Sequence, residues 1–154
     1  MDVTVEDVLK KGIDRELESQ RLYRDLVTRV KLPGAQYAFS VLVRQEEEHQ
    51  ALLDKYLTGG LKTGVLNIRQ VIDFRIAEYL DQPEVNPEMS LPDIFLVAAN
   101  REKKSNDFYT SLAKIHPEGE VKLLLLKLAS EELGHKQKVE SMYSDVALPQ
   151  TDGG

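Results

Sequence analysis

The chain of 154 residues is long enough for one ordinary domain and too short for a second folded unit of any size. Its net charge of −6 leaves no broad basic field for nucleic acid or an anionic membrane, and the absence of cysteine excludes disulfides, thiolate metal sites and thiol catalysis. The N-terminus has neither the basic start nor the apolar run of a signal peptide, and no stretch approaches the roughly 18 apolar residues of a membrane span, so we expect a cytoplasmic protein.

Apolar residues at helical spacing predict four long helices. They cover about residues 5–30, 34–57, 91–115 and 118–144. Thr4 and Asp7 have the spacing of a capping box, Ser90 is placed to cap the third helix, and Gly59-Gly60 marks the end of the second.

The connection between the second and third helices is unusually long. It contains some thirty residues, whereas adjacent antiparallel helices are usually joined by about two to eight. We therefore expect a crossover, with a short helix near 68–80, in an all-α four-helix bundle that has one long connection. Residues 1–146 are expected to form this domain, and residues 147–154 a flexible C-terminal tail.

The two halves of the chain resemble each other in sequence. A shift of 86 residues, without gaps, lays Thr4 on Ser90, Arg15 on Arg101, Glu16 on Glu102, Tyr23 on Tyr109, Glu46 on Glu132 and His49 on His135. This repeat predicts two duplicated helix pairs related by an approximate two-fold axis.

The repeated polar residues fall within the apolar stripes. The first and third helices each carry one glutamate in mid-stripe, and the second and fourth each carry Glu-x-x-His, whose two side chains share one helix face. We expect all of them to meet at the middle of the bundle. The candidate metal ligands are Glu16, Glu46, His49, Glu102, Glu132 and His135.

Four buried carboxylates would each cost several kcal/mol without a counter-charge, against a total stability of about 5 to 15 kcal/mol. No set of inward-facing Lys or Arg is expected at these heights, whereas two divalent cations would balance the four charges. Carboxylates with two imidazoles suit iron or manganese better than calcium or a structural zinc site. The sequence therefore predicts two metal ions per chain, iron first, with manganese or zinc as alternatives.

Tyr23 and Tyr109 lie two turns after Glu16 and Glu102 on the same helix faces. Each is either a core tyrosine or a group that orients a carboxylate or passes an electron, and they are the candidate catalytic residues. Gln20 and Asn106 are weaker candidates for the orienting role. Residues expected to have no metal role are Glu47, Glu48 and Glu131, which should face solvent, and His116, at a helix end.

Four stretches together resemble the rubrerythrin and ferritin-like superfamily. They are residues 15–23, 46–49, 101–109 and 130–135, and the likeness extends from about residue 4 to 144. The resemblance implies a ferritin-like four-helix bundle in which the six candidate residues bind iron, with Glu46 and Glu132 bridging the two ions.

The chain departs from full-length rubrerythrins in two ways. It lacks the cysteine-ligated iron domain that supplies electrons, so an external donor such as rubredoxin would be required. It also has Ala99 where rubrerythrins carry an additional glutamate, three residues before the third-helix ligand. The closer likeness is to single-domain rubrerythrin-like proteins.

The resemblance implies a di-iron oxidoreductase that reduces hydrogen peroxide and acts against oxidative stress. Three alternatives remain open at this point: a ferroxidase or iron-handling protein, an oxygen-activating di-iron hydroxylase, and a structural bundle that holds zinc or no metal. The expected partners are hydrogen peroxide or oxygen and the electron donor, with no nucleic acid and no membrane. A homodimer is compatible with the fold.

Overall fold

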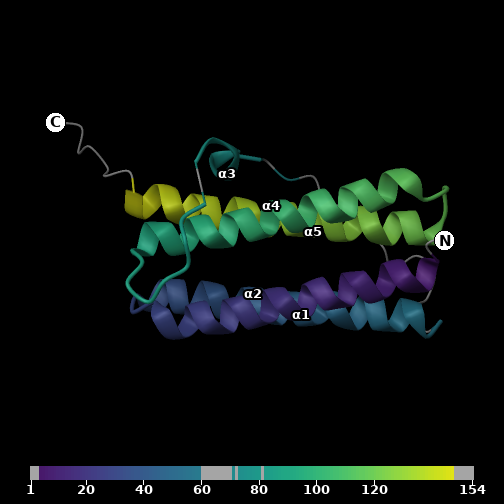
Figure 1. The fold of residues 1–154 in the computed structure, drawn as a ribbon, viewed down its shortest axis with the longest axis horizontal. Helices are drawn as coiled ribbons and strands as arrows, with labels where there is room; N and C mark the ends of the chain where they lie inside the picture. Colours follow the sequence, from purple (N-terminus) through teal and green to yellow (C-terminus); the bar gives the residue numbers. More distant parts are fainter. Residues whose placement is uncertain (1–3, 60–70, 72, 81, 148–154) are drawn as a thin grey trace.

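The computed structural model describes residues 4–59, 71, 73–80 and 82–147, and these residues form an all-helical bundle. Its elements are α1 (Val5–Arg29), α2 (Pro33–Leu57), α3 (Ile76–Tyr79), α4 (Leu91–Ile115) and α5 (Glu120–Ala147). The long helices form two antiparallel pairs, α1 with α2 and α4 with α5, which lie one above the other (Figure 1). The predicted helical bundle is thus confirmed. None of the described helices is both long and apolar enough to cross a membrane.

Local signals fix three of these helix ends as predicted, whereas the last long helix, expected over about 118–144, is α5. The hydroxyl of Thr4 accepts a 3.1 Å hydrogen bond from the Asp7 N–H, and the Asp7 carboxylate accepts one of 3.1 Å from the Thr4 N–H. At the start of α4, Ser90 Oγ accepts a 3.3 Å bond from a backbone N–H of the first turn. Beyond the end of α2, Gly59 has a φ of +77°, which glycine adopts at little cost.

The long connection contains less helix than expected among its described residues. Of the helix predicted near 68–80, only α3 is observed; residues 68–70 and 72 lie outside the described part of the chain. Ala77 of α3 is buried, and its N–H donates a 2.8 Å hydrogen bond to the Glu140 carboxylate on α5. This contact holds the connection against the bundle. Of the predicted tail, residues 147–154, Ala147 is the last residue of α5, and residues 148–154 lie outside the described part of the chain.

A buried lysine accompanies that contact. Lys136 on α5 is 1% exposed, and its ammonium group donates hydrogen bonds to Asp73 (2.6 Å), Glu140 (3.0 Å) and Glu78 (3.2 Å). Lys136 is a single buried lysine that the sequence did not indicate, whereas the expectation concerned a set of inward-facing Lys or Arg that would balance the candidate ligands. The charge of Lys136 is balanced by acids outside the six candidate ligands.

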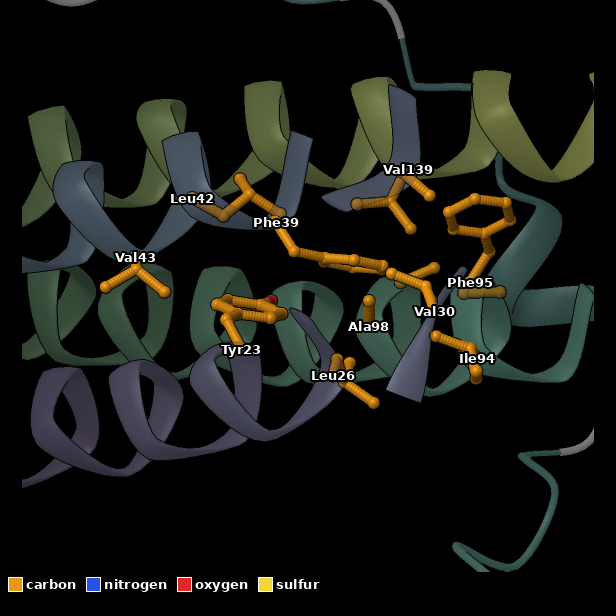
Figure 2. Close-up of a cluster of buried hydrophobic side chains, with 13 residues drawn as sticks. Tyr23, Leu26, Val30, Phe39, Leu42, Val43, Ile94, Phe95, Ala98 and Val139 are labelled. Atoms are coloured by element: carbon orange, nitrogen blue, oxygen red, sulfur yellow. The ribbon is translucent and has the colours of Figure 1, made fainter. Parts of the chain in front are cut away.

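Two apolar clusters fill the bundle on either side of a polar middle. In one, the ring of Phe39 stacks between Tyr23 and Phe95, with centroids 6.0 and 5.7 Å away (Figure 2). The other cluster, which contains Leu9 and Tyr109, lies toward the opposite ends of the helices. Along α1, Leu9 belongs to one cluster and Tyr23 to the other, so the middle of the helix is enclosed by apolar packing. Polar groups placed there are removed from water.

Candidate metal centre

The structure buries all six candidate ligands in this polar middle. Their exposed fractions are 0% for Glu46, Glu102 and Glu132, 1% for Glu16, 4% for His49 and 7% for His135. Each lies near the centre of a long helix. Each is buried because it continues the apolar stripe that faces the neighbouring helices. The sequence thus located these residues in the fold; metal binding itself stays a prediction.

The six side chains form two groups that share two members. One group is Glu16, Glu46, His49 and Glu132, and the other is Glu46, Glu102, Glu132 and His135. In each group, one potential ligand atom from every residue lies within 4.8 Å of the others. Glu46 and Glu132 belong to both groups, so the geometry is that of two adjacent sites with two carboxylates in common.

Both imidazoles direct Nδ1 into the cluster. Nδ1 of His49 lies 2.9 Å from Glu132 and 3.7 Å from Glu16. Nδ1 of His135 lies 2.8 Å from Glu46, and the two imidazole rings stack with centroids 5.4 Å apart. Each imidazole therefore contacts the shared glutamate of the other half of the repeat.

One oxygen of every carboxylate in the cluster lacks a hydrogen-bond partner among the described residues. These buried atoms are the Oε2 atoms of Glu16, Glu46, Glu102 and Glu132. Buried acceptors nearly always have partners, so four without one in a single cluster require an explanation. Divalent cations coordinated by these oxygens would supply it, and the donor set of carboxylate oxygens with imidazole nitrogens suits iron or manganese.

The electrostatics of the cluster favour protons where cations are absent. Burial, together with the charges of neighbouring carboxylates, raises the pKa values of Glu46 and Glu132 well above 4.5. Burial acts to raise the pKa of Glu16, but the neighbouring Glu46 carboxyl group and the His49 imidazole, whose Nδ1 lies 3.7 Å away, outweigh it and lower this pKa to about 2. Burial opposes protonation of His49, yet hydrogen bonds to carboxylates raise its pKa well above 6.5. Metal binding would have to displace the protons held here.

The two candidate catalytic tyrosines bind the outer glutamates crosswise. The Tyr109 hydroxyl on α4 donates a 2.6 Å hydrogen bond to Glu16 on α1, and the Tyr23 hydroxyl on α1 donates to Glu102 on α4. Burial, followed by the charges of nearby carboxylates, raises the pKa of both phenols well above 10.0, so both stay protonated and donate. These contacts fit the expected orienting role, whereas electron transfer through the phenols stays a prediction.

Gln20 and Asn106 do not contact the candidate ligands through the hydrogen bonds of their amides. The Gln20 amide donates a 2.9 Å hydrogen bond to Gln50, and the Asn106 amide donates one of 2.6 Å to the Ala129 carbonyl. Both residues join helices within a pair. Their expected role in orienting a ligand is therefore not supported.

Glu131 does not face solvent as the sequence predicted. Glu47 and Glu48 are exposed as predicted, but the Glu131 side chain is 23% exposed and contacts Nε2 of His49. Glu131 also accepts a 2.7 Å hydrogen bond from Lys127, one turn earlier on α5. Because Glu131 precedes Glu132 by one residue, it lies about 100° around the helix, at the edge of the buried stripe rather than opposite to it. In the sequence, the lysine four residues earlier could have indicated that the Glu131 carboxylate is paired rather than free in solvent.

A pair of arginines across the repeat was also missed. Arg101 Nε donates a 2.8 Å hydrogen bond to Ser19 Oγ, and Arg15 Nη2 donates one of 3.3 Å to Ser105 Oγ. The two bonds are equivalent under the 86-residue shift and join α1 to α4. The recurrence of both arginines in the repeat pointed to such a shared role.

A polar pocket borders the two histidines between α2 and α5. Its volume is about 320 Å³. Besides His49 and His135, its lining comprises Gln45, Glu48, Glu131, Gly134, Gln137 and Lys138. A second pocket of about 290 Å³ borders His49 and shares Glu48 and Glu131. The imidazole side of the cluster is thus adjacent to two surface pockets.

Comparisons with known proteins identify a related fold and no activity. No family model and no curated protein match the chain. The solved structure of a hypothetical protein from Pyrococcus furiosus is similar, with a TM-score of 0.65 and 23% identity over 92% of this chain and 89% of that chain. The likeness indicates a shared helical fold and says nothing of what the chain does.

Proposed function

We propose that this chain is a ferritin-like oxidoreductase similar to the single-domain rubrerythrin-like proteins, and that it reduces hydrogen peroxide at two iron ions. The observation that carries the proposal is the set of four buried carboxylate oxygens without partners, grouped with two imidazoles around two shared glutamates. A bundle that binds no cation would have to hold protons on these carboxyl groups instead, at raised pKa values of Glu46 and Glu132.

Each of the two groups of side chains would bind one of the two ions. Glu16 and His49 would hold one iron ion, Glu102 and His135 would hold the other, and Glu46 and Glu132 would contribute to both. When bound, two ferrous ions supply the two electrons that, with two protons, convert hydrogen peroxide to two molecules of water.

The surrounding side chains favour a small polar oxidant. The larger pocket beside the histidines is lined by amide and charged groups, which suit hydrogen peroxide better than an apolar organic substrate. A hydroxylase would need an apolar substrate site beside the metals. The choice of peroxide over oxygen rests on the resemblance to rubrerythrins.

The chain's own residues position the ligands and hold protons. Tyr23 and Tyr109 keep their protons at Oη and fix the orientation of Glu102 and Glu16 through hydrogen bonds. Because the chain has no cysteine, electrons would return from an external redox protein such as rubredoxin.

The test is a comparison of oxidants. Metal-free protein would be loaded anaerobically with two equivalents of ferrous iron and mixed with stoichiometric hydrogen peroxide or oxygen. We expect iron oxidation at least about tenfold faster with peroxide, a difference of about 1.4 kcal/mol in activation free energy. Oxidation by oxygen that is equal or faster would instead indicate a ferroxidase or a hydroxylase.

A pair of variants controls this test. Glu46→Gln removes a shared carboxylate and should lose rapid oxidation with both oxidants. Glu47→Gln changes the next residue, which is exposed and pairs with Arg24 on the surface, and should react as the unmodified chain does. Equal behaviour of the two variants would contradict the assignment of the site.

A further inference from the structure

The two halves of the candidate centre differ at one position that the repeat does not preserve. The 86-residue shift lays Glu131 on Gln45 and Lys127 on Val41. The pair that adjoins His49 therefore has no charged equivalent in the sequence of the other half. This difference lies beside the imidazoles, at the edge of the larger pocket.

The contacts of the two histidines show the same asymmetry. His49 presents Nδ1 to Glu132 at 2.9 Å, while its Nε2 donates to a Glu131 oxygen. The other Glu131 oxygen accepts a 2.7 Å hydrogen bond from Lys127, so the carboxylate is held from both sides. Nε2 of His135, in contrast, has no carboxylate within ion-pair distance in the described parts of the chain.

A carboxylate on the outer nitrogen changes how an imidazole binds a cation. Donation from Nε2–H fixes the tautomer in which the Nδ1 lone pair is free, and it makes that nitrogen more basic. The same bond fixes the orientation of the ring. Loss of such an outer partner typically weakens metal binding by about 10- to 100-fold.

We propose that Glu131 is a positioning residue that makes the two cation sites unequal, so that the His49 site binds the first divalent cation and the His135 site binds the second. The inference rests on the proposed two-metal centre and adds an order of filling to it. Lys127 would act through Glu131, by holding the carboxylate in place against His49.

The first experiment is a titration of the metal-free full-length chain with cobalt(II) under anaerobic conditions, followed by visible absorption and calorimetry. We expect two binding steps whose dissociation constants differ by about 10- to 100-fold. Glu131→Gln keeps the size of the side chain and removes its charge. It should weaken the first step by about tenfold or more, bring the two steps together and alter the absorption spectrum of the first-bound ion.

Glu48→Gln is the matched control. Glu48 lines the same two pockets, and no hydrogen bond or ion pair joins it to either histidine. This variant should retain two separated steps. If it weakened the first step as much as Glu131→Gln does, the effect would come from the general charge of the pocket, and the proposal would be overturned.

Single-histidine variants locate the effect. His135→Ala keeps the His49 site and His49→Ala keeps the His135 site, with circular dichroism to establish that each variant is folded. Glu131→Gln should weaken the remaining cobalt site by about tenfold or more in the first background and leave it unchanged in the second. If the single-histidine chains do not fold, the titration of Glu131→Gln alone decides.

The possible failures separate the two proposals. A Glu131→Gln chain that binds two cobalt ions with both steps unchanged would overturn the role of Glu131 and leave the centre intact. An unmodified chain that binds no cobalt would overturn both proposals.

Discussion

The Tyr109 hydroxyl on α4 donates a 2.6 Å hydrogen bond to Glu16 on α1, and so joins the two halves of the repeat at the level of the candidate metal centre. Tyr23 on α1 makes the reciprocal bond to Glu102 on α4. Each outer glutamate is therefore held by a phenol from the opposite half. Because both phenols are fully buried, these bonds are shielded from competition with water.

Tyr109→Phe should destabilise the metal-free chain by about 1.5 to 3 kcal/mol, since it removes a buried hydrogen bond to a charged group. Tyr23→Phe should cost a similar amount. Urea unfolding monitored by circular dichroism measures both losses. Tyr37→Phe is the control, because Tyr37 is 67% exposed, and it should change the free energy of unfolding by no more than about 0.5 kcal/mol. Equal losses in all three variants would contradict the role of the buried phenols.

The stability of the metal-free chain should fall as the pH rises above about 4.5. Burial and neighbouring carboxylates raise the pKa values of Glu46 and Glu132, so the native state binds more protons than the unfolded chain in this range. The raised pKa of His49, which hydrogen bonds to carboxylates produce against the effect of burial, extends the fall above pH 6.5. Glu16, with a pKa of about 2, acts in the opposite direction only below about pH 4.5. Urea unfolding of metal-free protein across this range measures the trend, and a stability that rises with pH would contradict it.

Divalent cations should reverse this dependence, because they replace the bound protons and bind more tightly as the pH rises. The increase in melting temperature on adding manganese(II) should be larger at about pH 7.5 than at about pH 5.5. Thermal unfolding with and without the ion at both pH values tests this. An increase that is the same at both would indicate that the cation binds elsewhere.

Lys136→Met should destabilise the chain by about 3 to 5 kcal/mol, because it leaves the fully buried Glu140 without its charged partner. The double variant Lys136→Met/Glu140→Leu removes both charges and should recover part of that loss in a denaturant titration. Lys122→Met is the control: Lys122 pairs with Glu118, whose side chain is 90% exposed, and the expected loss is within about 1 kcal/mol. A double variant no more stable than Lys136→Met would show that the buried pair is not the cause.

The shared and the outer glutamates should differ in their effect on metal binding. Glu46→Gln alters a carboxylate common to both groups and should weaken both steps of a cobalt titration. Glu16→Gln alters a carboxylate of one group and should weaken mainly one step. If both variants weakened a single step equally, Glu46 would not be shared between two ions.

Much of the fold follows from local sequence signals. The capping box at Thr4 and the glycine after α2 depend only on neighbouring residues, and the structure confirms both. The positions of Glu16 and His49 could also be predicted, because each interrupts an apolar stripe and recurs in the second half of the chain. Periodicity and the repeat were sufficient for this level of detail.

What could not be predicted depends on contacts between distant helices. A helical period gives the face on which a residue lies and does not give its partner, so the bond from Tyr109 to Glu16 required the three-dimensional arrangement. Glu131 lies at the edge of its stripe, where exposure depends on how closely α2 approaches α5. Lys136 is buried because the connection folds back onto it and supplies Asp73 and Glu78 as partners. No local sequence pattern indicates these contacts.

If one chain binds two metal ions through the six candidate ligands, the bound metal can be counted. Metal-free chain would be dialysed to equilibrium against ferrous iron under anaerobic conditions, and the iron bound per chain would then be measured. We expect two iron ions per chain, and far fewer in a variant that carries both Glu46→Gln and Glu132→Gln. An unmodified chain that retains no iron, or a double variant that binds iron as well as the unmodified chain does, would contradict this expectation.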